Sequence, residues 1–220
     1  MTYVMSDIHG HRERFDSILA QINLQPEDRL YILGDVIDRN PHGLSILLQL
    51  MQMPNVTMLL GNHEYMMLDV LSYPEDYSSL AIWYQNGGKK THSRWKGLPR
   101  NVRQQVIRYL KALPLNIPLQ VNGENYLLVH GAPEADWDPD MENYDSATIY
   151  AVWHRVAPDD APTPEHTIIF GHTPTLYYQE GEPLRIWYGE NKIGIDCGAA
   201  YHEGRLACLR LDDGKEFYSN

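Results

Sequence analysis

The chain of 220 residues is 43% hydrophobic and 21% charged, a composition that suits one folded domain with a sizeable core. It has no run of about 18 apolar residues that could form a transmembrane helix, and its formal net charge of -11 disfavours nucleic acid or an anionic membrane as a partner. Its two cysteines, Cys197 and Cys208, are too few for a disulfide framework, and its first residues lack the pattern of a signal or transit peptide, so we expect a cytoplasmic protein.

The first third of the sequence alternates between β-prone runs and helical periodicity. Strands are predicted at residues 2–6, 29–34 and 55–61 ("TYVMS", "RLYILG" and "NVTMLLG"). Between them, residues 11–24 place apolar side chains at helical spacing, and a second helix is predicted to start near Pro41. This strand-helix-strand-helix-strand order predicts a parallel sheet covered by helices.

The remainder of the chain divides into a helical part and a β-rich part. Residues from about 65 to 115 are expected to form helices and loops, as a helical insertion within a single domain of residues 1–220. Strand patterns return in "ENYLLVHGAP", "HTIIFGHTP", "KIGIDCGAA" and "RLACLRLDDG", with turn residues between them. The second half is therefore expected to be richer in strands, and antiparallel at its close.

Each of the three N-terminal strands ends in polar residues, in "SDIHG", "GDVIDR" and "GNHEYM". In an open sheet of this type ligands gather at the carboxyl ends of the strands, so these clusters are expected at one edge. Each cluster alone has a simpler explanation, because Asp7 and Asp35 could be turn residues, His9 a surface histidine and Asn62 a helix cap. Together, a mixture of Asp, Asn and His suits divalent cations such as manganese, iron or zinc.

The motifs "DIHG", "GDVIDR", "GNHE", "VHG" and "FGHTP" occur in this order, each after an apolar run. This series resembles the calcineurin-like metallophosphoesterase superfamily, specifically its phosphoprotein phosphatase branch, which includes compact bacterial and phage enzymes. The similarity extends from Ser6 to about Ala199. It implies an α/β fold in which a β-sandwich is flanked by helices in α/β/β/α layers, with a βαβαβ N-terminal half.

The resemblance also implies two divalent metal ions, manganese first, with iron or zinc as alternatives. One carboxylate from the second motif would bridge the two ions, which two-metal hydrolases hold close together. The implied ligands are Asp7 and His9 for the first ion, Asp35 for both, and Asn62, His130 and His172 for the second.

Four further residues receive roles from the same resemblance. Asp38 would orient His63, and this pair would protonate the departing alkoxide while a hydroxide shared by the two ions attacks phosphorus in line. Arg39 would clamp phosphate oxygens in a bidentate geometry that lysine cannot copy, and Arg155 would complete the clamp. No covalent phosphoenzyme is expected.

The implied function is hydrolysis of phosphate monoesters, with phosphoserine or phosphothreonine in proteins, phosphotyrosine, or a small phosphoester as the substrate. Relatives with the same five motifs hydrolyse dinucleoside tetraphosphates, and this pyrophosphohydrolase activity stays open as the alternative. The aromatic residues that could stack on a nucleobase are Trp83, Tyr84, Trp95, Tyr177 and Tyr178.

Two other functions are less expected. A non-catalytic scaffold would be expected to have lost some ligands, whereas all six ligand positions, His63 and Arg39 are present. A phosphodiesterase for cyclic nucleotides or nucleic acid would carry a second histidine where Pro174 follows "GHT". Asn40, where eukaryotic protein phosphatases have glycine, weakens the transfer of eukaryotic substrate preference but leaves the metal site unaffected. The sequence specifies no oligomeric state.

Overall fold

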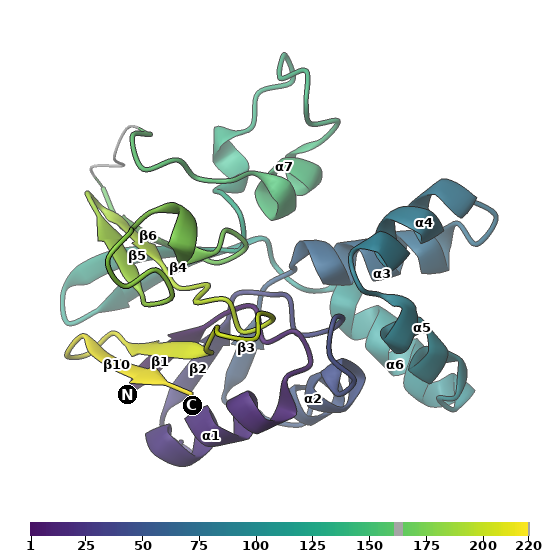
Figure 1. Ribbon diagram of the computed structural model, residues 1–220, viewed down its shortest axis with the longest axis horizontal. Coiled ribbons are helices and arrows are strands. Elements are labelled where there is room, and N and C mark those ends of the chain that lie inside the picture. The colour runs from purple at the N-terminus through teal and green to yellow at the C-terminus, as the bar shows by residue number, and fades with distance from the viewer. Residues whose placement is uncertain (161–164, 220) are drawn as a thin grey trace.

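The structure, a computed structural model, describes residues 1–160 and 165–219. Its described strands form two five-stranded sheets that lie face to face (Figure 1). The first sheet has the order β10-β9-β1-β2-β3, and its strands are β1 (Thr2–Met5), β2 (Arg29–Ile32), β3 (Val56–Met58), β9 (Ala207–Arg210) and β10 (Lys215–Tyr218). β1, β2 and β3 are parallel, as predicted, whereas β9 and β10 are antiparallel and confirm the expected close of the chain.

The second sheet has the order β4-β5-β6-β8-β7. Its strands are β4 (Asn116–Val121), β5 (Glu124–Val129), β6 (Thr167–Phe170), β7 (Trp187–Gly189) and β8 (Lys192–Gly194). The three inner strands β5, β6 and β8 are parallel, with antiparallel strands at both edges. The loops that follow the three inner strands therefore leave the sheet at one edge, toward the site described below.

Helices flank both sheets and extend from one side of the molecule (Figure 1). α1 and α2 lie on the outer face of the first sheet, α3 to α6 form the helical region that was predicted from about residue 65 to 115, and α7 lies beside the second sheet. Their bounds are α1 (Arg12–Ile22), α2 (Gly43–Leu50), α3 (Asn62–Ser72), α4 (Tyr77–Gln85), α5 (Lys89–Lys96), α6 (Arg100–Lys111) and α7 (Ala147–Trp153). Two short 3-10 helices, η1 (Glu134–Asp136) and η2 (Thr175–Tyr177), lie in loops.

Alternate residues of β1 pack into two different cores. Tyr3 and Met5 belong to the cluster that includes α1 and α2, whereas Val4 packs between the sheets in the same cluster as Ile169 of β6. A third cluster, which includes Tyr150 of α7, covers the outer face of the second sheet. The layers therefore run helix, sheet, sheet, helix, which confirms the predicted sandwich.

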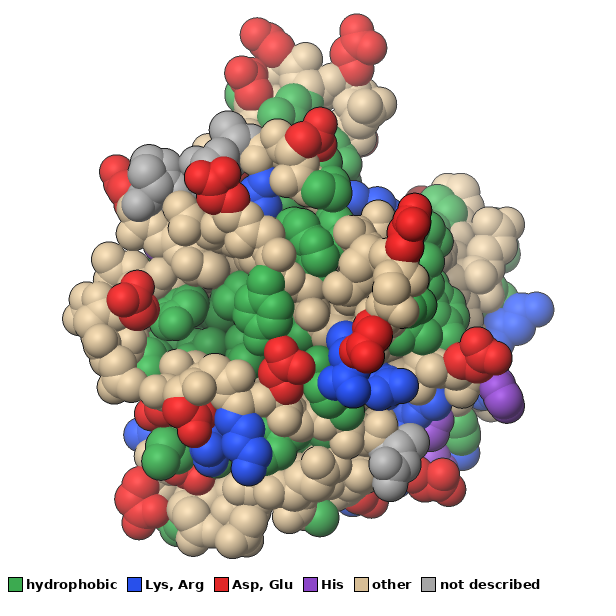
Figure 2. All heavy atoms as spheres, turned by 60° about the vertical axis from the view of Figure 1, so that its left-hand side comes forward, with side chains coloured by type: hydrophobic (Ala, Val, Ile, Leu, Met, Phe, Trp, Pro, Cys, Tyr) green, Lys and Arg blue, Asp and Glu red, His purple; other side chains and the backbone are tan. Residues whose placement is uncertain are grey.

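The surface carries the negative charge that the composition predicts. Figure 2 shows acidic side chains spread over the visible face, with basic side chains in smaller groups. In the part of the chain that the structure describes, no helix has the length and hydrophobicity needed to cross a bilayer.

Candidate active site

The turns that follow β1 and β2 place polar side chains through left-handed backbone. Asp7 and His9 have φ angles of 53° and 46°, and Asp35, Asp38 and Arg39 have φ angles of 53°, 71° and 62°. Such conformations are costly for residues with a Cβ and persist where surrounding structure enforces them, often at functional sites. Here the two turns support each other, because the His9 N–H donates to the Asp35 carbonyl at 2.9 Å.

Glu64 holds the turn that follows β2. Its buried carboxylate accepts the backbone N–H groups of Asp35, Val36 and Ile37 at 2.8, 2.9 and 3.2 Å. Gly61 allows the two segments to meet, because a Cβ at this position would lie 2.3 Å from the Asp35 carboxylate. The turn is thus held by backbone contacts that leave the Asp35 side chain free to face the site.

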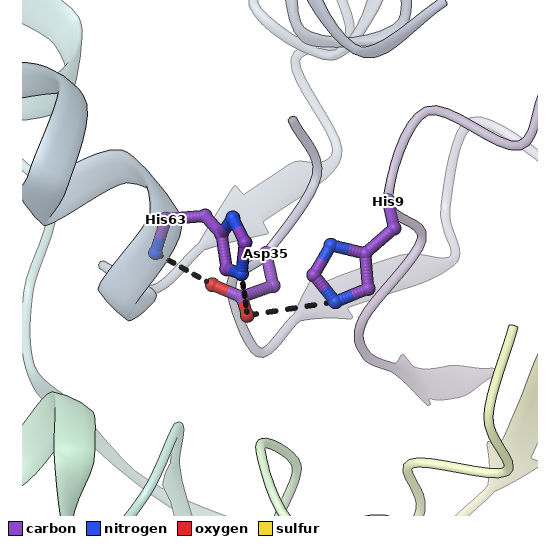
Figure 3. A group of neighbouring side chains, drawn as sticks. All are labelled: His9, Asp35 and His63. Atoms are coloured by element: carbon purple, nitrogen blue, oxygen red, sulfur yellow. Dashed lines mark hydrogen bonds and ion pairs between the residues drawn. The ribbon is translucent and has the colours of Figure 1, made fainter. Parts of the chain in front are cut away.

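The Asp35 carboxylate lies at the centre of the predicted ligands. Figure 3 shows the rings of His9 and His63 on either side of it, with their Nε2 atoms 3.7 and 3.8 Å from Asp35 Oδ2. His9 Nε2 also lies 3.8 Å from Asp7 Oδ1, and His130 Nε2 lies 3.5 Å from the other Asp35 oxygen. Each oxygen of the Asp35 carboxylate therefore has a histidine nitrogen nearby, as a ligand shared by two metal ions requires.

Asn62, the first residue of α3, joins the loops after β5 and β6. Its side-chain oxygen lies 3.0 Å from His130 Nε2 and 3.0 Å from His172 Nδ1. Two groups of side chains have donor atoms close enough to hold an ion, and they share Asp35. The first consists of His9, Asp35 and His63, of which His63 is the predicted proton donor, and the second of Asp35, His130 and His172. The structure thus brings together all six residues predicted as ligands, which are Asp7, His9, Asp35, Asn62, His130 and His172.

Each of the three predicted histidine ligands directs a nitrogen lone pair inward. Its outward ring nitrogen lies against a backbone carbonyl, and since a carbonyl only accepts, that nitrogen carries the proton. The pairs are His9 Nδ1 with Ile37 O (3.2 Å), His130 Nδ1 with Leu33 O (2.6 Å) and His172 Nε2 with Trp153 O (3.1 Å). Burial also lowers the pKa of His9 and of His172 well below the usual value, so both stay neutral. Neutral imidazoles with inward lone pairs fit metal ions.

A further buried carboxylate, Asp196, was missed by sequence reasoning. It follows β8 and is 5% exposed, and one of its oxygens accepts the Gly198 N–H at 2.9 Å. Burial, with the negative charge of Asp7 nearby, raises its pKa, and burial likewise raises the pKa of Asp35. Bound cations would offset this crowding of buried carboxylates. The signal was present in "KIGID", which repeats the apolar strand ending in aspartate of "LYILGD".

His63 and Asp38 form a buried pair beside these ligands. His63 Nδ1 lies 2.7 Å from Asp38 Oδ2, and the Trp83 indole N–H donates to the same oxygen at 2.7 Å. On its other side, His63 Nε2 lies 3.4 Å from a guanidinium nitrogen of Arg39. Because His63, Asp38 and Trp83 are each 0% exposed, the imidazole is held in one orientation.

Arg39 lies exposed at the edge of this cluster, against the loop between α4 and α5. Its backbone N–H donates to the Gly87 carbonyl at 3.3 Å, and the Lys90 ammonium donates to its carbonyl at 3.5 Å. Gly87 has φ of 98°, which favours glycine. The loop that contains Gly87 and Gly88 thus supports Arg39, which is predicted to clamp phosphate.

Arg155 lies in the loop after α7, two residues beyond Trp153, whose carbonyl accepts from His172 Nε2. Its side chain is exposed, and its positive charge adds to burial in lowering the pKa of His172. Burial raises the pKa of Tyr201, and the positive charges of Arg39 and Arg155 act in the opposite direction. Arg39 thus contacts His63, and Arg155 follows the segment that contacts His172, although the two arginines are far apart in sequence.

The aromatic residues proposed for base stacking are mostly unavailable. Trp83 and Trp95 are buried, and Tyr178 stacks on Trp187 inside the second sheet's outer cluster. Tyr177, by contrast, is 65% exposed. Tyr201, which sequence reasoning did not select, is 40% exposed, and burial raises the pKa of its hydroxyl.

Comparisons with known proteins agree with this geometry. A family model described as calcineurin-like phosphoesterase matches residues 2–199. A symmetrical bis(5'-nucleosyl)-tetraphosphatase of Yersinia pestis (strain Pestoides F) is 39% identical over 154 residues, which is 69% of this chain and 48% of the relative. Serine/threonine-protein phosphatase 2 of Salmonella typhimurium is 31% identical over 143 residues, which is 64% of this chain and 61% of the relative.

The fold has close counterparts among solved structures. A metallophosphoesterase from Sphaerobacter thermophilus aligns with a TM-score of 0.57 at 17% identity, over 99% of this chain and 87% of that one. At this identity the likeness concerns the fold. The matched regions span between about half and three fifths of the length of the two curated relatives above, at 48% and 61%.

Proposed function

Because the chain belongs to the calcineurin-like phosphoesterase family, we propose that it hydrolyses phosphate monoesters, with phosphoserine or phosphothreonine in proteins, or phosphotyrosine, as the substrate. The buried His63–Asp38 pair beside Arg39 is the observation that supports this most directly. An alkoxide leaves only if it gains a proton, so a positioned proton donor next to the phosphate clamp favours an ester of an alcohol.

Members of this family depend on two metal ions, and the six converging side chains fit such ions. When bound, the ions would supply a nucleophile at neutral pH and neutralise charge on the phosphate. We propose manganese first, with iron or zinc as alternatives, because mixed carboxylate, amide and imidazole donors suit this group of cations. The proposed ligands are Asp7, His9, Asp35, Asn62, His130 and His172.

The chain's own residues would act on the two ends of the bond that breaks. Arg39, from the turn after β2, and Arg155, from the loop after α7, bind the phosphate oxygens. When Arg39 turns to the phosphate, it leaves the 3.4 Å contact with His63 Nε2. That nitrogen is then free to hold a proton and pass it to the leaving oxygen, while the Asp38 carboxylate stabilises the charged imidazole.

A second candidate is the hydrolysis of dinucleoside tetraphosphates. Two observations favour it, the name of the Yersinia relative and the exposed rings of Tyr177 and Tyr201, on which a nucleobase could stack. A nucleotide leaving group is a weaker base than an alkoxide and depends less on a proton from His63. The two candidates therefore differ in how strongly they need the His63–Asp38 pair.

One experiment separates the candidates. Manganese-loaded protein is assayed in parallel on a phosphoserine peptide, para-nitrophenyl phosphate and diadenosine tetraphosphate, with wild-type protein and with His63→Asn. We expect the largest kcat/KM on the monoesters and the largest loss on the phosphoserine peptide in the variant. A strong preference of the wild-type protein for the dinucleotide would replace the first candidate by the second.

A further inference from the structure

Two loops beside the site belong to no sheet or helix. The first follows α7 and includes residues 154–160, with Arg155 near its start. The second follows β8 and includes residues 198–204, with Tyr201 at its exposed turn. Both loops begin beside buried residues of the site, because the Trp153 carbonyl accepts from His172 Nε2 at 3.1 Å and the Gly198 N–H donates to Asp196 at 2.9 Å.

A buried lysine holds the first loop. Lys192 of β8 is only 1% exposed, although lysine is almost never fully buried without a partner. Its ammonium donates to three backbone carbonyls of the loop, those of Ala157 and Pro158 at 3.3 Å each and that of Asp160. The three donors of the ammonium group are thus all used on one loop.

Two more contacts fix the chain on either side of Arg155. The Tyr178 hydroxyl donates to the Val156 carbonyl at 2.6 Å, and His172 Nε2 donates to the Trp153 carbonyl at 3.1 Å. Arg155 itself has an exposed side chain and lies between these anchors. Its backbone position is therefore set by side chains of the second sheet and its loops, while its guanidinium remains free for a ligand.

A buried arginine holds the second loop in the same manner. Arg14 of α1 is 8% exposed, and its guanidinium donates to the carbonyls of Ala199 at 2.6 Å, Tyr201 at 3.0 Å and His202 at 3.2 Å. The loop also turns tightly at Gly198, whose φ is 72°. Tyr201 is consequently fixed along its backbone while its ring is presented to solvent.

Burying a cation costs free energy, and both Lys192 and Arg14 are buried. Exposed loops usually satisfy their carbonyls with water, and a cation loses its hydration when it is buried. Val156 and Ala199 of the two held loops pack into the core, whereas the neighbouring side chains of Arg155 and Tyr201 are exposed. We propose that Lys192 and Arg14 are positioning residues, of which Lys192 sets the affinity for phosphate through Arg155 and Arg14 sets the affinity for the rest of the substrate through Tyr201.

The role of Lys192 is tested with inorganic phosphate as the probe on manganese-loaded protein. Lys192→Met should weaken inhibition by phosphate roughly tenfold, as a misplaced clamp does. In the Arg155→Ala background the same substitution should have no further effect, since both act through one guanidinium. Lys111→Met, which removes an exposed lysine at the end of α6, is the matched control and should leave inhibition unchanged.

A second variant and a second readout keep this test independent of folding. Tyr178→Phe removes only the hydroxyl that holds the Val156 carbonyl, and should produce a smaller loss of the same kind. Trypsin should cut after Arg155 faster in Lys192→Met than in the wild-type protein. Unchanged phosphate inhibition in a folded Lys192→Met protein, or additive losses with Arg155→Ala, would overturn the role of Lys192.

The role of Arg14 predicts a different pattern with the same assays. Arg14→Met and Tyr201→Ala should each raise KM for para-nitrophenyl phosphate, roughly tenfold if the ring stacks on Tyr201, and leave phosphate inhibition unchanged. Tyr73→Ala is the control, because Tyr73 is also an exposed tyrosine, at 65% against 40% for Tyr201, but lies at the end of α3. An equal loss of phosphate affinity in Arg14→Met would contradict the division between the two loops.

Since Arg155 binds phosphate only if the proposed function is correct, the two failures must be distinguishable. Wild-type phosphate inhibition in Arg155→Ala would refute the clamp and with it that part of the proposed function. Weakened inhibition in Arg155→Ala, combined with wild-type behaviour of Lys192→Met, would refute only the positioning role.

Discussion

The two sheets supply the site in different ways. The turns after β1 and β2 hold Asp7 and Asp35 almost fully buried, through strained backbone and contacts between the turns themselves. The second sheet also contributes buried ligands, but the exposed Arg155 and Tyr201 lie on long loops near it that are held by buried cations. The residues that would hold metal are thus fixed mainly at strand ends. Of the residues that would contact substrate, Arg39 shares the turn after β2 with Asp35, whereas Arg155 and Tyr201 are fixed by loops and can change without disturbing the metal ligands.

The largest expected effect comes from the residue at the centre of the first group. Asp35→Asn should remove one or both ions and lower turnover by ~10³-fold or more, because metal ions stabilise the transition state by several kcal/mol. Metal content by mass spectrometry and kcat on para-nitrophenyl phosphate measure this. Asp16→Asn, on the exposed side of α1, is the control. Unchanged metal content in Asp35→Asn would contradict the bridging role.

His63 lies between the two groups, because it touches both the ligands and Arg39. His63→Asn should keep the ions bound and slow the hydrolysis of alkyl phosphates by roughly 10²- to 10⁴-fold, the range of general acid catalysis. Aryl phosphates, which leave more readily, should lose less. His42→Asn, which changes an exposed histidine before α2, should behave as wild type. Equal losses on alkyl and aryl substrates would exclude His63 as the proton donor.

Arg39 tests whether phosphate binding is separate from metal binding. Arg39→Ala should weaken inhibition by inorganic phosphate by roughly 10- to 100-fold, since a hydrogen bond to a charged group contributes about 1.5 to 3 kcal/mol. Metal content should stay at the wild-type level. Inhibition at wild-type strength in this variant would remove Arg39 from the clamp.

Gly171 tests the contact between the two sheets. A Cβ at this position would lie 2.0 Å from Ser6 Oγ and 2.4 Å from an oxygen of Asp7. Gly171→Ala should therefore displace Asp7, lower the free energy of unfolding by about 1 to 3 kcal/mol and weaken metal binding. Thermal unfolding with and without manganese gives both quantities. Wild-type metal affinity would show that the contact between the sheets does not position Asp7.

The smallest effect is expected in the helical region, away from both groups. Asp76 caps α4 by accepting from Ser78 and Ser79, and these hydrogen bonds lower the pKa of its carboxyl to about 2. Its contribution to stability is present above the ordinary carboxyl pKa of about 3.9 and is lost as the pH falls toward 2. Asp76→Ala should reduce stability slightly at pH 7 and less at pH 2, with turnover unchanged. A loss of turnover would link the helical region to the site.

The same contrast between strand ends and loops explains what the sequence could predict. Asp7, Asp35 and His130 follow apolar strands directly, so periodicity and the carboxyl-end rule place them at one edge. Asp196 obeys the same rule and could have been found by it. Lys192 could not, because a lysine at the start of a strand carries no sign that its ammonium will turn inward to a loop 32 to 35 residues away.

The aromatic residues show the same difference. Exposure depends on packing between distant segments, and Trp83 is buried because its indole N–H reaches Asp38, 45 positions earlier. The exposed Tyr201 is positioned because Arg14, 187 positions earlier, holds its carbonyl. Edge strand β4 was also not predicted, because its pairing with β5 depends on a neighbour. Local patterns therefore specify the ligand positions better than they specify the surroundings of the substrate.

The most direct test is the anomalous diffraction of a crystal of this protein soaked with manganese. We predict two peaks roughly 3.5 to 4 Å apart, one beside Asp7 and His9, the other beside Asn62, His130 and His172, with the Asp35 carboxylate between them. A single peak, or peaks away from Asp35, would contradict a two-metal centre at the meeting point of the two sheets.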